Sequence, residues 1–128
     1  MNFLANRKEN RVFTDFVTKM QKNPEAVVKQ NDRFTSVIFT VATSNDKAVV
    51  SIIKAEDADL VTIRVMKAIQ NTSDLLLKCN EYNSNSAGII TFVTQDKLVT
   101  SMSVQSEDEK VFMNVVAQLL VALTYLLK

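Results

Sequence analysis

The segment from Val111 to Leu127 predicts a long helix that is apolar on two sides. Only Asn114, Gln118 and Thr124 are polar within it. At about 100° per residue, most of its large side chains fall on one wide arc, which has to be buried. The members of this arc are Phe112, Val115, Val116, Leu119, Leu120, Leu123, Leu126 and Leu127. The rest of the chain must therefore supply a broad apolar surface that covers the arc.

The opposite side of the same helix carries a second apolar strip. Ala117, Val121 and Tyr125 are spaced by four residues, so they align as one ridge. Two interpretations stay open: the ridge contacts another protein surface, or another part of the same domain, such as a first helix, covers it. We expect an interface at this ridge. Leu77, on the outer side of an earlier helix, is a further expected contact residue.

The start of this helix has the spacing of a capping box. The Ser106 hydroxyl is placed to accept a hydrogen bond from a first-turn amide, and Glu109 is placed to reach back to the cap amide. A membrane anchor is the alternative use of such a helix, since about 17 apolar residues is the lower limit for spanning a bilayer. Asn114 and Gln118 lie within the run, so we expect a core and interface helix with no membrane partner.

From residue 26 to residue 69 the apolar residues recur with a period of two, which is typical of β-strands. The strand candidates in this region are residues 26–28, 34–43, 48–55 and 60–69. Short polar turns separate them, which favours an antiparallel meander. Whether residues 26–30 join the sheet is left open. Later in the chain, residues 89–94 and 98–104 predict a hairpin.

Two further helices complete the pattern. The first is predicted to end at Asn23-Pro24, because proline disfavours a helical conformation in the residue before it. Its inner face, spaced i, i+3, i+4, i+7, consists of Phe13, Phe16, Val17 and Met20. The second helix is expected to be capped by residues 71–73. Its inner face is expected to consist of Leu75, Leu76, Cys79, Tyr82 and Asn83.

These elements predict an α+β fold in the order α-β-β-β-(β)-α-β-β-α. The expected architecture is a two-layer sandwich, in which an antiparallel sheet of five or six strands is covered on one face by three helices. No linker or repeat divides the chain, so residues 1–128 are expected to form one domain. Residues 1–10 are predicted to be flexible, and the core is predicted to cover about residues 11–127.

The inventory of side chains excludes several kinds of active site. The chain contains no histidine, which excludes serine–histidine and cysteine–histidine catalysis as well as histidine metal sites. Gly88 is the single glycine, so a glycine-rich phosphate loop is excluded too. The single cysteine, Cys79, is predicted to be a buried, inert thiol. We therefore expect no enzyme activity, no metal and no cofactor.

The remaining polar clusters have simple structural interpretations. Glu56, Asp57 and Asp59 lack the spacing of a calcium loop and predict a solvated hairpin turn. Glu107 and Asp108 suit the start of a helix better than acid–base chemistry. The amides of residues 80 and 83, both asparagine, are expected to bond backbone groups of the following turn, with contact to a ligand as the alternative.

Charge and cysteine content restrict the partners and the compartment. The chain has 15 basic and 14 acidic residues, a net charge of +1, which gives no signal for nucleic acid or an anionic membrane. A small basic cluster at Arg7, Lys8 and Arg11 is interpreted as solvated. The first residues lack the apolar stretch of a secretory signal, and one cysteine allows no intramolecular disulfide. We expect a cytoplasmic protein.

The order of elements and one short motif resemble the YbjN family. The motif, Leu-Leu-Lys-Cys-Asn-Glu-Tyr-Asn at residues 76–83, is followed by a strand at residues 89–93. It is similar to the family's pattern of a helix with two asparagines three apart, followed by a strand. The family, known as bacterial sensory transduction regulators, shares the fold of type III secretion chaperones. The resemblance covers about residues 11–127 and implies a small protein-binding or regulatory domain, often dimeric, without catalytic residues.

The functional hypothesis from the sequence is a non-enzymatic protein-interaction module, chaperone-like or regulatory, that forms a homodimer through its C-terminal helix. Its expected interface residues are Ala117, Val121, Tyr125 and Leu77. The alternative is a sensor domain that binds a small-molecule ligand in an apolar cavity between sheet and helices. A third option, an enzyme relying on carboxylates or Ser/Lys pairs, has no motif in its favour.

Overall fold

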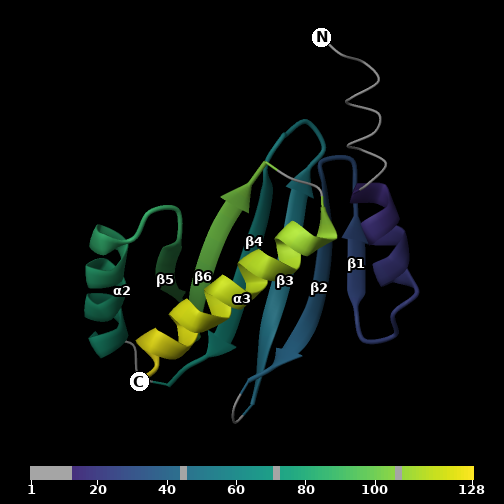
Figure 1. Ribbon diagram of the computed structural model, residues 1–128. Helices are drawn as coiled ribbons and strands as arrows, with labels where there is room; N and C mark the ends of the chain where they lie inside the picture. Colours follow the sequence, from purple (N-terminus) through teal and green to yellow (C-terminus); the bar gives the residue numbers. More distant parts are fainter. Residues whose placement is uncertain (1–12, 44–45, 71–72, 106–107) are drawn as a thin grey trace.

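Six strands form one antiparallel sheet in the computed structural model, which describes residues 13–43, 46–70, 73–105 and 108–128 (Figure 1). The strands are β1 (Val27–Gln30), β2 (Phe34–Ala42), β3 (Lys47–Ala55), β4 (Val61–Ala68), β5 (Ile90–Thr94) and β6 (Lys97–Val104). Their order across the sheet is β1-β2-β3-β4-β6-β5. The first four strands are thus a meander, and the β5–β6 hairpin adds to it through β6. Residues 27–30 do join the sheet, as one of its two edge strands.

The described residues also contain three helices: a first helix over residues 13–21, α2 (Ser73–Asn85) and α3 (Glu109–Leu126). Figure 1 shows α3 crossing one face of the sheet diagonally, with α2 at the β5 end and the first helix at the β1 end. The predicted α+β class and the order α-β-β-β-β-α-β-β-α are confirmed, with six strands.

The core lies between the sheet and α3. Val37, Ile52 and Ile63 stand directly opposite one another on three neighbouring strands and are completely buried. The side chains that α3 buries against this face are Phe112, Val115, Val116, Leu119, Ala122, Leu123 and Leu126. The buried Thr100 hydroxyl lies 3.2 Å from the carbonyl oxygens of Leu119 and Val65, so one side chain of β6 links the helix to the sheet.

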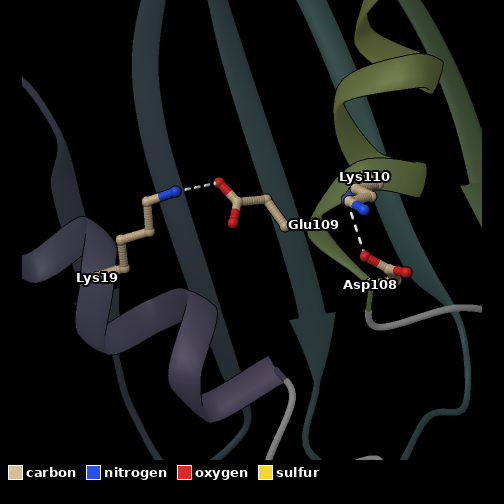
Figure 2. A network of polar contacts seen from close by, with 4 residues as sticks. All are labelled: Lys19, Asp108, Glu109 and Lys110. Carbon is tan, nitrogen blue, oxygen red and sulfur yellow. Dashed lines mark hydrogen bonds and ion pairs between the residues drawn. The ribbon is translucent and has the colours of Figure 1, made fainter.

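The start of α3 differs from the prediction. Asp108 is the N-cap, and its carboxylate accepts a hydrogen bond of 2.9 Å from the Lys110 amide (Figure 2). Glu109 is thus the first helical residue and not the third, so the role that the predicted Ser106–Glu109 capping box gave to Glu109 is wrong. An aspartate is as good an N-cap as a serine, and its negative charge is favourable at the positive end of the helix dipole. The described residues do not include 1–12, 44–45, 71–72, Ser106 and Glu107.

Two predicted faces also need correction. Leu127 is exposed and Leu120 is only partly buried, whereas Ala122 is buried, because α3 ends at Leu126 and presents a slightly rotated arc to the sheet. On α2 only Leu75 and Cys79 are buried, and Leu76 is exposed. This helix packs on the edge strand β5 and barely on α3, so the stripe that it buries is narrow.

Asn83 fastens α2 to the outer edge of β5. Its Nδ2 donates to the Thr91 carbonyl and its Oδ1 accepts from the Thr91 amide, both at 2.8 Å. The Thr91 hydroxyl donates to the same Oδ1 at 3.0 Å. One side-chain amide thus pairs with the strand backbone as a neighbouring strand would. Asn83 thus has a structural role, but its backbone partner is strand β5 and not the turn after α2. The same expectation for Asn80 is not met among the described residues.

Replacing Asn83 with alanine should lower the free energy of unfolding by about 1–2 kcal/mol, because the Thr91 backbone groups lose their partners in a partly buried setting. Urea denaturation measures the change. Asn80→Ala, an exposed site on the same helix, is the matched control and should be nearly neutral. Equal effects of the two substitutions would show that the amide pairing contributes nothing specific.

The first helix is held to α3 mainly by aromatic packing. The ring of Phe112 lies 5.3 Å from that of Phe16 and 6.2 Å from that of Phe13, centroid to centroid, in edge-to-face geometry. An ion pair joins the same elements, with Lys19 Nζ 2.7 Å from Glu109 Oε1 (Figure 2). Its side chains are 65% and 39% exposed, so water screens the attraction. Packing should therefore dominate the attachment.

Phe16→Ala is expected to lower the free energy of unfolding by about 3–5 kcal/mol through loss of buried area and a new cavity. Lys19→Gln is expected to cost less than about 1 kcal/mol, as exposed ion pairs do. Chemical denaturation of both variants and the parent protein gives the two values. If Lys19→Gln lowers the free energy of unfolding more than Phe16→Ala does, packing is not the main attachment of the first helix.

Candidate interaction surface

The outer ridge of α3 is exposed. Val121 is 70% exposed and Tyr125 65% exposed, and Ala117 is also at the surface. Met113, one further step of four along the helix, is exposed too and extends the ridge toward the N-terminus of α3. The first helix contacts the buried side of α3 through Phe112, so no element in the described parts of the chain covers the ridge. Burial within the domain, the other interpretation of this ridge, is not seen.

A groove of about 710 Å³ runs between α2 and the C-terminal half of α3. Val121 and Tyr125 form part of its α3 wall, and the ring of Tyr82 on α2 lies 6.1 Å from that of Tyr125, at 50°. The complete lining is Lys78, Glu81, Tyr82, Asn85, Ser86, Val121, Ala122, Tyr125 and Lys128. Part of the ridge therefore continues into a concave surface that two helices share.

Lys78 holds the two walls of the groove together. Its Nζ donates to the Lys128 carbonyl at 2.7 Å and lies 3.5 Å from the Leu126 carbonyl. The last carbonyls of a helix have no intrahelical partner and carry the negative end of its dipole, so an ammonium group there is stabilising. Asn83 holds α2 to β5, and Lys78 holds it to the C-terminal end of α3. These contacts fix the position of α2, which sets the width of the groove.

The four predicted interface residues do not form one patch. Val121 and Tyr125 line the groove, and Ala117 lies one turn away on the same ridge. Leu77 is 71% exposed, as predicted, but lies on the outward side of α2 and does not line the groove. Exposed Leu76 is its neighbour there. Sequence reasoning missed Met113 and Tyr82. The four-residue spacing from Ala117 is a signal that could have identified Met113. The contribution of Tyr82 to the groove has no such signal, because it depends on how α2 and α3 pack.

The other residues considered for chemistry are placed as follows. Cys79 is a free, buried cysteine, and Glu56 and Asp57 lie exposed in the β3–β4 turn. Among the described residues no three His, Cys, Asp or Glu side chains are grouped so as to hold a metal ion. Gly88 has φ +94°, a conformation that L side chains rarely adopt, and lies in the loop before β5.

By length and composition α3 is long and apolar enough to cross a membrane, and it is the one such helix in the described parts of the chain. Core helices of soluble proteins meet the same criterion, so this is weak evidence for a membrane segment. Seven of its side chains are buried in this structure.

No protein-family model matches the chain, and neither a curated protein nor a solved structure does. The assignment of a function therefore rests on the surfaces of the molecule.

Proposed function

We propose that this chain is a non-enzymatic protein-interaction module, chaperone-like or regulatory, that forms a homodimer through α3. The exposure of Val121 and Tyr125 carries the proposal. Fully burying an apolar side chain of this size contributes about 1.5–3 kcal/mol, so a partner that covers both gains substantially. Tyrosine and methionine are also enriched where proteins meet, and Met113 and Tyr125 stand at the two ends of the ridge.

A second copy of the chain is the partner that suits the ridge. The most common homodimers are two-fold symmetric, so the same patch must fit itself. The small Ala117 side chain lies between Met113 and Val121, which lets a second α3 helix approach closely at the middle of the ridge. The resemblance to the YbjN family and to type III secretion chaperones agrees with a dimeric, regulatory, bacterial and cytoplasmic protein. Leu77 is proposed as a peripheral contact.

Val121→Glu should dissociate this dimer, because it places an unpaired carboxylate in the buried centre of the interface. Sedimentation equilibrium should give twice the chain mass of 14.4 kDa for the parent protein and 14.4 kDa for the variant. We expect dimer affinity to fall at least about tenfold, which is ~1.4 kcal/mol.

The matched control is Thr18→Glu, which adds the same charge at an exposed site on the first helix and should leave the dimer intact. Circular dichroism of both variants checks that the monomer is still folded. A parent protein that stays monomeric at millimolar concentration would disprove the dimer.

The alternative function, a small-molecule sensor, has one observation in its favour. The groove between α2 and α3 has a volume within the usual ~300–1,000 Å³ of ligand sites, and two tyrosine rings lie side by side in its wall. This site lies between two helices and not between the sheet and the helices.

If the groove binds a metabolite, a thermal-shift screen should find compounds that raise the melting temperature of the parent protein by mass action. The increase should disappear in Tyr82→Ala but persist in Leu77→Ala, an exposed site on the same helix outside the groove. A shift that survives Tyr82→Ala places the ligand elsewhere.

A further inference from the structure

The sheet has a second face, opposite α3. Successive residues of a strand point to opposite faces, and Val50, Ile52, Ile63 and Val65 point toward α3. Their neighbours along each strand therefore form the outer face. In Figure 1 the described helices lie on the α3 side or at the two ends of the sheet. Outer-face residues such as Val49 and Arg64 are exposed.

An apolar row runs across four strands on this outer face. The pairing places Val49 opposite Met66, Met66 opposite Val99, and Val99 opposite Phe92. Neighbouring strands lie about 4.8 Å apart, so the row is about 14 Å long. Val49 is exposed and Met66 and Phe92 are partly so, whereas Val99 is buried between its neighbours. The row is therefore a shallow apolar strip that runs perpendicular to the strands.

Basic side chains border the row on both sides. On one side of the row, Arg64 lies two residues before Met66 on β4. It is paired with Ser51 on β3 and with Ser101 on β6. Its guanidinium lies 5.8 Å from the centroid of the Phe92 ring. On the other side of the row, Lys47 lies two residues before Val49 on β3, and Lys97 lies two residues before Val99 on β6. Both lysines are therefore on the outer face.

The charges of the sheet are all of one sign. The six described strands contain six basic residues and no aspartate or glutamate: Lys29, Lys47, Lys54, Arg64, Lys67 and Lys97. Alternation puts Lys29, Lys47, Arg64 and Lys97 on the outer face. Three carboxylates directly adjoin strand ends, and all three lie in the turns beyond the strands: Asp46, Glu56 and Asp96. The outer face is thus basic although the whole chain is almost neutral.

We propose that this outer face binds an amphipathic helix of a partner protein whose apolar stripe is bordered by acidic side chains. The apolar strip would cover the stripe, and Arg64 on one side and Lys47 and Lys97 on the other would meet the carboxylates. At 1.5 Å per residue, about nine to ten helical residues span the row. Ser51, Ser101 and Ala68 are small, so a helix can approach the sheet closely beside the row.

A helix suits this face better than an extended peptide. The backbone groups of central strands are already paired within the sheet, so an extended peptide lying on the face would leave its own N–H and C=O groups without protein partners. A helix satisfies its backbone internally. Nucleic acid is disfavoured because single strands need exposed aromatic rings for base stacking. Phe92 is the one aromatic residue in the row, and Arg64 already lies over its ring.

The test uses fluorescence anisotropy with two labelled peptides of about 16 residues, both held helical by a lactam bridge. Each has leucines along one stripe, bordered by glutamate in the acidic peptide and by lysine in its charge-swapped counterpart. We expect the parent protein to bind the acidic peptide at least about tenfold more tightly than the basic one, a difference of ~1.4 kcal/mol. The double variant Arg64→Glu/Lys97→Glu should reverse this preference.

Binding of the basic peptide by that variant also shows that the variant is folded. Lys22→Glu/Lys110→Glu changes the net charge equally at exposed sites on the helical side and should keep the acidic preference. Equal binding of both peptides, no binding, or loss of the preference in the control variant would overturn the proposal. Tighter binding of a labelled oligothymidylate than of the acidic peptide would overturn it in favour of nucleic acid. Because Val121→Glu leaves this face intact, failure of the dimer and failure of this site are distinguishable.

Discussion

The packing of α3 against the sheet is the contact on which the rest of the structure depends. It buries seven side chains of the helix against the fully buried residues of the central strands, and Thr100 adds a polar link in the same interior. The other two helices attach to the sandwich partly through α3. The first helix does so at Phe112, and α2 does so through Lys78 at the C-terminal end. Loss of the α3 contact would therefore remove partners from every helix in the fold.

A two-layer architecture has a single interior, which explains why two apolar surfaces stay open. The sheet needs cover on one face only, and α3 supplies it with one side of its circumference. The remaining side of α3 and the outer face of the sheet both keep apolar side chains, namely Val121 and Tyr125 on one and Val49 and Met66 on the other. Solvation of scattered apolar residues is ordinary, but aligned rows of them favour partners.

The sequence predicts most of the fold because the alternation of apolar residues in a strand and their helical spacing both follow directly from backbone geometry. The sequence predicts less well those features that depend on tertiary contacts. Leu76 satisfies the helical pattern but is exposed, because α2 lies at the edge of the sheet. The exposed ridge of Val121 and Tyr125 is foreseeable from periodicity. The groove partner Tyr82 and the row from Val49 to Phe92 are not, because they depend on how α2 packs and on strand register.

The two proposed surfaces lie on opposite layers of the sandwich, and this placement constrains how they can work together. A two-fold dimer built on α3 puts the helical layers inside and leaves both outer sheet faces pointing away from the axis. Each face then keeps its own apolar row with Arg64, Lys47 and Lys97 beside it. Such a dimer can bind two partner helices without competition between them. If one partner carries both helices, the second binds as an intramolecular step, which raises the overall affinity without any new contact.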